Sequence, residues 1–132
     1  MQREEEREMF GLLADQGVGS IPWSPLAKGR LARPWGTQTH RSENDPVGQR
    51  FYASADQPIA DAVQAVAEQR GVPMAQVALA WVLRNPVVVA PIVGPTKPHH
   101  LPDAVAALDL QLTAEEVAAI EKPYTLRPPT GY

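Results

Sequence analysis

The chain of 132 residues has a net charge of −3 and 44% hydrophobic residues, which fits one domain with a packed core and argues against nucleic acid as a partner. It contains no cysteine, which excludes disulfides, thiolate metal sites and a cysteine nucleophile. No apolar run approaches the ~18 residues that span a bilayer, and the first residues lack the apolar run of a signal peptide, so we expect a soluble, cytoplasmic protein with no membrane partner.

The first half predicts a helix, a strand and a long loop. Apolar residues recur at helical spacing after an acidic start, which predicts a helix over residues 3–15. The apolar run at residues 18–24 predicts a buried strand, although Pro22 inside it cannot donate to a strand ladder. Residues 27–55 are rich in glycine and proline and predict a long loop, which in a compact domain is typically a functional lid or a disordered segment.

Two neighbouring helices are predicted next. Pro58 suits the first turn of a helix and Gly71 suits its C-terminal cap, which predicts a helix over residues 58–70. Pro73 opens the second helix. Both helices carry apolar stripes that indicate core packing: Ile59, Val63, Val66 and Ala67 in the first, and Met74, Val77, Ala78 and Trp81 in the second.

The last third predicts a second strand and two short helices. Residues 87–93 are rich in β-branched residues and apolar on both alternations, which is typical of a strand covered on both faces in a parallel sheet. A helix is expected within residues 98–108, with its regular part beginning near Leu101. A capping box at residues 113–116 starts the last helix, and residues 123–132 form a proline-rich, irregular tail.

This alternation of strands and helices predicts the α/β class with parallel strands. The number of strands, however, is small. Two parallel strands cannot make a stable sheet with both faces covered, and a complete (β/α) barrel needs eight strands and about 250 residues.

Three segments in this order carry a family resemblance: residues 23–27 (Trp-Ser-Pro-Leu-Ala), 77–83 (Val-Ala-Leu-Ala-Trp-Val-Leu) and 91–101 (Pro-Ile-Val-Gly-Pro-Thr-Lys-Pro-His-His-Leu). Together they resemble the last two barrel units of aldo-keto reductases, NADP-dependent oxidoreductases that reduce aldehydes or ketones. The resemblance covers nearly the whole chain. It implies a partial (β/α)8 TIM barrel, made of the last two βα units and the C-terminal helices, as one domain over residues 1–132. It also implies that the chain begins just before the sixth helix of a longer protein.

The resemblance implies NADP(H) as cofactor, with NAD(H) as the alternative. Trp23 resembles the aromatic residue that stacks on the nicotinamide, and Arg41 resembles a basic loop residue that folds over the cofactor. The segment along the pyrophosphate is matched by Ser24, Pro25, Leu26 and Ala27. The segment around the adenosine and its 2′-phosphate is matched by Gly94, Thr96, Lys97, His100 and Asp103.

Elementary chemistry agrees with this assignment. In (β/α) barrels, ligands bind at the C-terminal ends of strands, and phosphates often lie at the loops after strands seven and eight. Gly94 would let the backbone approach a phosphate, Thr96 offers a hydroxyl donor and Lys97 a positive charge. A neutral His100 would hold a 2′-phosphate less firmly than arginine, so the choice between NADPH and NADH stays open.

Three of these residues also have a purely structural interpretation. Trp23 could belong to the core, Gly94 could be an ordinary turn glycine and Lys97 could be a solvated surface lysine. The pair His99 and His100 does not indicate a metal site, because adjacent helical residues point in different directions and no acidic or histidine cluster completes the coordination.

No catalytic residue is predicted, because the aspartate, tyrosine, lysine and histidine of the family belong to earlier strands. Tyr52, Tyr124 and Tyr132 lie in a loop or the tail, without a lysine and an acid placed beside them. We therefore expect a chain that binds a nicotinamide dinucleotide and is inactive alone. The alternatives are a non-catalytic cofactor-binding or interaction module, and a truncated gene product without independent function. Uncovered barrel edges would also allow self-association.

Overall fold

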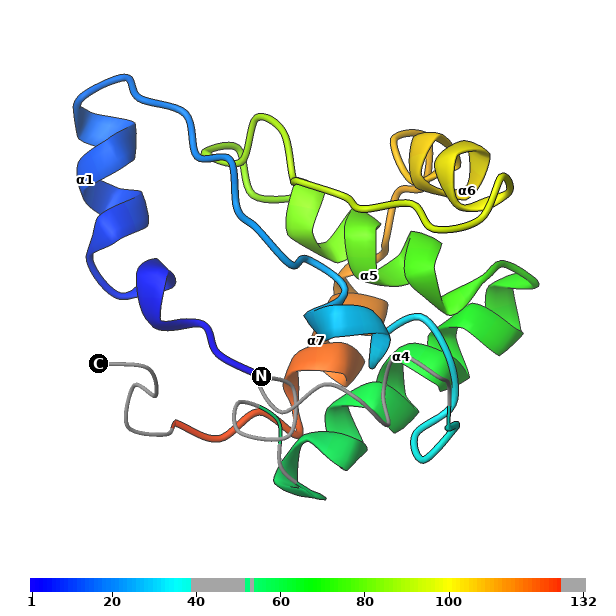
Figure 1. Ribbon diagram of the computed structural model, residues 1–132. Coiled ribbons are helices and arrows are strands. Elements are labelled where there is room, and N and C mark those ends of the chain that lie inside the picture. The colour runs from blue at the N-terminus through cyan, green and yellow to red at the C-terminus, as the bar shows by residue number, and fades with distance from the viewer. Residues whose placement is uncertain (39–51, 53, 127–132) are drawn as a thin grey trace.

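The computed structural model describes residues 1–38, 52 and 54–126. The α-helices of this part are α1 (Met9–Asp15), α4 (Gln57–Arg70), α5 (Met74–Leu83), α6 (His100–Ala106) and α7 (Ala114–Glu121), as Figure 1 shows. Short 3-10 turns precede or join them: η1 (Glu4–Glu6), η2 (Ala27–Gly29) and η3 (Ser54–Asp56). Helix α4 contacts both α5 and α7, and α5 contacts α6.

The hydrophobic core lies between α4, α5 and α7. Its buried members are Val63, Val66 and Ala67 of α4, Met74, Val77 and Ala78 of α5, and Ile120 of α7. The predicted stripes of α4 and α5 are therefore confirmed, except that Trp81 packs against this cluster while only partly buried. Gly71 ends α4 in the left-handed conformation at φ 65°, which glycine adopts without steric cost, and Pro73 precedes α5 as predicted.

The predicted capping box begins α7. The Thr113 hydroxyl accepts a hydrogen bond from the Glu116 N–H at 3.3 Å, and the Glu116 carboxylate accepts one from the Thr113 N–H at 2.7 Å. Arg70, the last residue of α4, donates two further hydrogen bonds to this carboxylate, at 2.5 and 2.7 Å. Glu116 thus ties the start of α7 to the end of α4.

These contacts make the stability of the chain pH-dependent. The Arg70 guanidinium, together with the Thr113 N–H, lowers the pKa of Glu116 from 4.5 to about 2. Because the folded-state pKa lies below the ordinary value, the carboxylate stabilises the fold above pH 4.5, and this contribution is lost as the pH falls towards 2. Urea unfolding of Glu116→Gln should show a smaller loss of stability than the unchanged chain between pH 5 and pH 3. Arg70→Met should reduce the loss in the same way, and an unaltered pH profile in both variants would contradict this assignment.

Extended segments around Ser20–Trp23 and Val88–Ile92 run side by side in parallel, joined by the bridges Ser20–Val88 and Trp23–Ile92. The predicted strands at residues 18–24 and 87–93 are wrong as regular strands, because the described residues form only these isolated bridges. Three backbone hydrogen bonds connect the segments: Ser20 to the Val87 carbonyl, Val89 to the Ser20 carbonyl and Ile92 to the Pro22 carbonyl.

Two prolines account for the interrupted ladder. In a regular parallel ladder, the hydrogen bonds after the Ser20–Val88 bridge would be donated by residues 22 and 91. Both residues are prolines, which have no N–H to donate. The next donor is Ile92, whose N–H reaches the Pro22 carbonyl at 2.9 Å. The parallel direction was predicted correctly, while the regularity was not.

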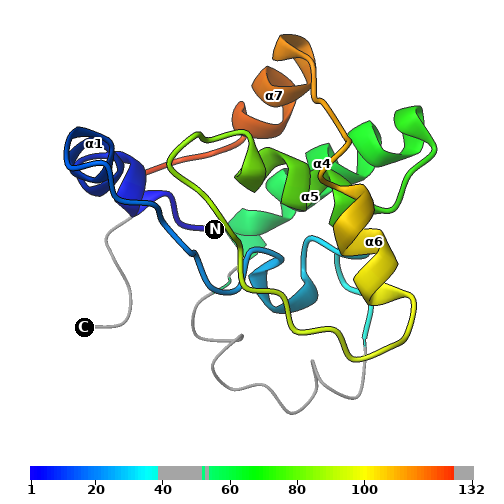
Figure 2. The same ribbon diagram turned by 90° about the horizontal axis from the view of Figure 1, so that it is seen from above.

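The predicted helix over residues 3–15 is broken into η1 and α1. Glu8, at φ −134°, interrupts the helical backbone between them. Neither element contains a buried residue, and the side chains of Met9 and Leu12 are exposed. Figure 1 and Figure 2 both show α1 standing apart from the group formed by α4, α5 and α7. The apolar side of this helix therefore has little to pack against within the described part of the chain.

The remaining predictions concern α6, the loop and the tail. Helix α6 begins at His100, one residue before the expected Leu101. Much of the predicted loop at 27–55, including Arg41, lies outside the described residues, as does most of the tail. None of the helices that the structure describes is both long and apolar enough to cross a membrane.

Candidate dinucleotide site

The ends of the two extended segments lie next to each other, because Trp23 pairs with Ile92 in a parallel bridge. Trp23 is 70% exposed, so it is not a core residue. An indole that is held at a segment end and open to solvent can offer its face to a flat aromatic ligand. The stacking position that the resemblance assigns to Trp23 stays a prediction.

The backbone after Trp23 adopts an unusual conformation. Ser24, Ala27 and Lys28 have φ values of 53°, 48° and 55°, in the left-handed region that costs a non-glycine residue roughly 1–2 kcal/mol. The Ser24 hydroxyl accepts a hydrogen bond from the Lys28 N–H at 3.2 Å, and the Ser24 carbonyl accepts one from the Ala27 N–H at 2.9 Å. Leu26, which belongs to this turn, packs against the hydrophobic core. Such conformations are concentrated at binding sites, where neighbouring contacts hold them in place.

The second predicted group surrounds the start of α6. Gly94, Thr96 and Lys97 are exposed, and the space around Gly94 is open. The Thr96 N–H donates to Nδ1 of His100 at 3.2 Å, so in the neutral imidazole the proton is carried by Nε2. Asp103 accepts a long hydrogen bond of 3.5 Å from the Gln76 side chain. The histidine thus closes the turn before α6 through its Nδ1 atom.

A concavity of about 700 Å³ opens between η1, α1, the segment after Ser20 and the α4–α5–α7 group. Of the predicted site residues, Trp23, Ser24, Pro25 and Ala27 line it. Leu26 and all the predicted residues from Gly94 to Asp103 lie outside its lining. The structure therefore brings the two segment ends together at the Trp23–Ile92 bridge, but it does not gather both groups of residues in one cavity.

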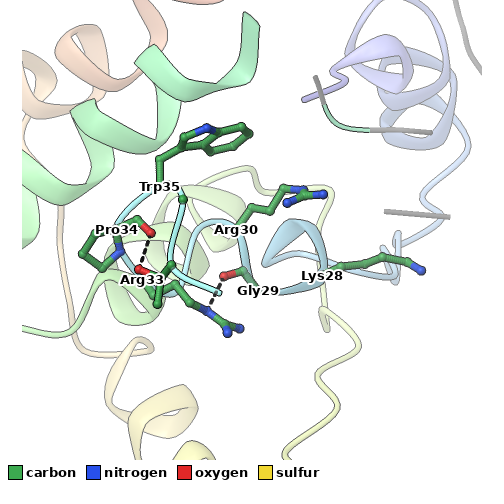
Figure 3. A pocket seen from close by; sticks show the side chains of 8 residues that line it. Lys28, Gly29, Arg30, Arg33, Pro34 and Trp35 are labelled. Atoms are coloured by element: carbon green, nitrogen blue, oxygen red, sulfur yellow. Dashed lines mark hydrogen bonds between the residues drawn. The ribbon is translucent and has the colours of Figure 1, made fainter. Parts of the chain in front are cut away.

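A basic loop follows the Trp23 segment, and the sequence analysis did not single it out. A cavity of about 40 Å³ is lined by Lys28, Arg30 and Arg33, together with Gly29, Pro34, Trp35, Gly36 and Thr37 (Figure 3). The signal was present in the sequence as three basic residues within six positions, directly after Ser-Pro-Leu-Ala. Their position on one cavity, however, became evident only in the structure.

The tyrosines of the described part lie against arginine side chains. The Arg30 guanidinium lies 5.3 Å from the ring centroid of Tyr52, and the Arg3 guanidinium lies 5.3 Å from that of Tyr124. Tyr132 is outside the described residues. Arginine–aromatic stacking is a structural role that occupies a face of the ring and demands no proton transfer from the hydroxyl.

Comparison with known proteins identifies the family. The sequence model of the Aldo/keto reductase family matches residues 1–124. The chain is 43% identical over 127 residues to versiconal hemiacetal acetate reductase of Aspergillus parasiticus, covering 92% of this chain and 37% of that protein. It is 41% identical over 132 residues to aldo-keto reductase AMT2 of Alternaria alternata (98% and 35%), and 35% identical over 126 residues to the putative aryl-alcohol dehydrogenase AAD16 of Saccharomyces cerevisiae (92% and 36%). The chain thus spans little more than a third of the length of these relatives, and it belongs to the aldo/keto reductase family.

Proposed function

We propose that this chain forms the last two units of a (β/α)8 barrel and binds a nicotinamide dinucleotide at the ends of its two extended segments. The Trp23–Ile92 bridge carries this proposal, because it sets side by side the two segment ends to which a dinucleotide would bind. The exposed indole of Trp23 fits a nicotinamide ring, and the Ser24 turn fits the pyrophosphate beside it.

The other end of the dinucleotide would lie against residues 94–103. The open backbone at Gly94 and the exposed Thr96 hydroxyl and Lys97 ammonium suit an adenosine ribose with a phosphate. His100 would offer its single Nε2–H when neutral, which is a weaker partner for a 2′-phosphate than arginine. We propose NADP(H) as the cofactor, with NAD(H) as the alternative that this histidine leaves open.

Catalysis would require the remaining barrel units of a whole aldo/keto reductase. The names of the relatives, two reductases and an alcohol dehydrogenase, favour reduction of an aldehyde or ketone, or its reverse, for such a protein. Hydride transfer to a carbonyl needs a proton donor near the carbonyl oxygen. We propose that the chain alone supplies the cofactor surface without that donor. Clear cofactor-dependent turnover of an aldehyde by the purified chain would contradict this part of the proposal.

Tryptophan fluorescence tests the cofactor surface directly. Titration with NADPH should quench the emission, because the exposed Trp23 would be covered by the nicotinamide. Stacking of a flat base on an aromatic residue contributes about 1–3 kcal/mol, so Trp23→Leu should weaken binding about fivefold or more and remove most of the quenching. Leu12→Ala serves as the control, because it trims an exposed apolar side chain outside the lining of the concavity, and it should keep both quenching and affinity. No quenching of the unchanged chain at millimolar NADPH would contradict the proposed site.

A second proposal is self-association through the face beside α1. Helix α1 and the chain around the two extended segments carry exposed large apolar side chains, which are Met9, Leu12, Val18, Ile21, Trp23, Val89 and Ile92. A group of exposed apolar residues of this kind favours contact with another protein surface. The outer backbone edges of the two extended segments could take part, since an unpaired edge accepts another strand.

A further inference from the structure

The first extended segment has an outer backbone edge without a partner among the described residues. Ser20 and Pro22 use their backbone groups on the inner side, towards the second segment. Because successive residues of an extended chain direct these groups to opposite sides, those of Ile21 and Trp23 lie on the outer side. Neither Ile21 nor Trp23 donates or accepts a backbone hydrogen bond within the described part of the chain. The outer edge therefore offers N–H and C=O groups to another strand.

The second extended segment has a corresponding outer edge. Val89 and Ile92 donate to the first segment, so their backbone groups lie on the inner side. Ala90, which follows Val89, directs its N–H and C=O outwards, and it makes no backbone hydrogen bond within residues 1–38, 52 and 54–126. The two outer edges face opposite ways, and the two segments run in the same direction. The outer edge of one segment can therefore pair in parallel with the outer edge of the other segment in a second copy of the chain.

Neither edge carries the features that commonly keep strand edges apart. Natural proteins protect such edges with charged side chains, especially lysine, or with proline on the outer side. Residues 18–24 and 87–93 contain no charged residue. Pro22 and Pro91 stand at positions of the inner ladder, where they interrupt the pairing of the two segments and leave the outer donors in place. This arrangement favours pairing with another chain.

The side chains beside these edges are apolar, and one face of each segment is uncovered. Ile21 and Trp23 lie on the same face of the first segment, and both are exposed. In the second segment Val88 is buried, whereas Val89 is exposed. Edge pairing between copies would therefore place exposed apolar side chains of one copy beside those of the next and remove part of their surface from water.

We propose that copies of this chain associate by parallel pairing of the outer edge of residues 19–23 in one copy with the outer edge of residues 88–93 in the next. This pairing specifies the self-association proposed above, on which it rests. Because the two edges differ, the contact is head-to-tail and repeats from copy to copy until the assembly closes. The parallel sheet of a (β/α) barrel closes at eight strands, so two segments from each copy predict a ring of about four copies.

Sedimentation velocity of the purified chain over a range of concentrations is the measurement, and about four copies are expected in the largest species. Ile21→Pro removes a donor from one outer edge, and Ala90→Pro removes a donor from the other. Each variant should require an at least tenfold higher concentration to associate. Far-ultraviolet circular dichroism checks that the helices are retained. Where a proline variant fails to fold, Ile21→Lys or Ala90→Lys replaces it, because a charge at the edge disfavours pairing and keeps the backbone N–H.

A mixture of the two proline variants tests the head-to-tail contact. Ile21→Pro keeps the outer edge of the second segment, and Ala90→Pro keeps that of the first, so one contact can form between the two variants and none can follow it. At a concentration where each variant alone is monomeric, we expect the mixture to form dimers. Pro22→Ala is the matched control, because it changes a residue of the inner ladder, and it should assemble like the unchanged chain.

Association that persists unchanged in both proline variants would overturn the edge pairing and keep self-association through the apolar side chains of α1. An effect of only one of the two variants would also overturn it, because a contact between unlike edges needs both. A monomeric chain at every concentration up to about 1 mM, where even weak specific contacts form, would overturn the edge pairing and the self-association together.

Discussion

Ile120→Ala should destabilise the folded chain by about 2–5 kcal/mol, the range for truncating a buried isoleucine to alanine. Ile120 is the buried residue of α7, at 5% exposure, and it joins the core cluster of α4 and α5. Domains of this size are stable by only about 5–15 kcal/mol, so the loss is a large share of the total. Thermal unfolding followed by far-ultraviolet circular dichroism should show a clearly lower midpoint.

Ile21→Ala is the matched control, because it removes the same atoms from a side chain that is 61% exposed. A change of about 0.5 kcal/mol or less is expected for such a surface position. Equal losses in the two variants at high protein concentration, with only the Ile21→Ala loss disappearing on dilution, would show that the face beside α1 is covered by another copy. Equal losses at every concentration would contradict the assignment of Ile120 to the core and Ile21 to the surface.

The helices that the sequence predicted most closely are those with local signals at both ends or along one face. Gly71 ends α4 because glycine adopts the left-handed conformation without steric cost. Thr113 begins α7 by accepting a hydrogen bond from Glu116, which lies only three residues further along the chain. The apolar stripes at helical spacing identified Val63 and Val77 as core. Each of these features depends on residues close together in the sequence, so it can be read without the tertiary structure.

The strands and the first helix were predicted less accurately than the other elements, for a physical reason. A strand is stabilised by its neighbours, and here each extended segment has one partner whose donors are interrupted at Pro22 and Pro91. The helix expected at residues 3–15 has no buried face in the described structure, so little holds it in one piece across Glu8. Propensity and periodicity alone do not report whether a packing partner is present.

In the candidate site, too, some features could be predicted from the sequence and others could not. The pairing of the segment ends at Trp23 and Ile92 followed from the expectation of parallel neighbours, since the carboxyl ends of parallel strands meet at one edge. The stacking of Arg30 against Tyr52 could not be inferred, because it joins the two sides of a long loop. Spacing in the sequence likewise gave no sign that residues 94–103 would lie outside the main concavity.

A charged network beside the core also joins residues that are distant in the sequence. The Glu121 carboxylate accepts a hydrogen bond from Nε1 of Trp81 at 3.0 Å, pairs with Arg84, and lies 3.4 Å from Nη1 of Arg3. Both guanidinium groups lie over the Trp81 ring, at 5.0 Å for Arg3 and 4.8 Å for Arg84. Glu121 is thus the anion that allows two cations to share one indole, and it connects the N-terminal segment with α5 and α7.

Glu121→Gln should therefore destabilise the chain by about 1–2 kcal/mol, because a charged acceptor of several hydrogen bonds becomes neutral while the two cations stay together. The amide oxygen can still accept from Trp81, so the shape of the site is preserved. For a chain of this length, the unfolding midpoint should fall by about 4–8 °C. Glu4→Gln is the control: it breaks the exposed pair with Arg7, which contributes only about 0.2–1 kcal/mol.

A double-mutant cycle with Arg84→Met separates the charge interaction from packing. If Glu121 acts by neutralising the cations at Trp81, removal of Arg84 should lower the cost of Glu121→Gln, because one of the two repelling charges is gone. Independent, additive losses in the double variant would instead assign the effect to the Trp81 and Arg3 contacts. A Glu121→Gln chain as stable as the Glu4→Gln control would mean that the network contributes nothing to joining the N-terminal segment to the helical core.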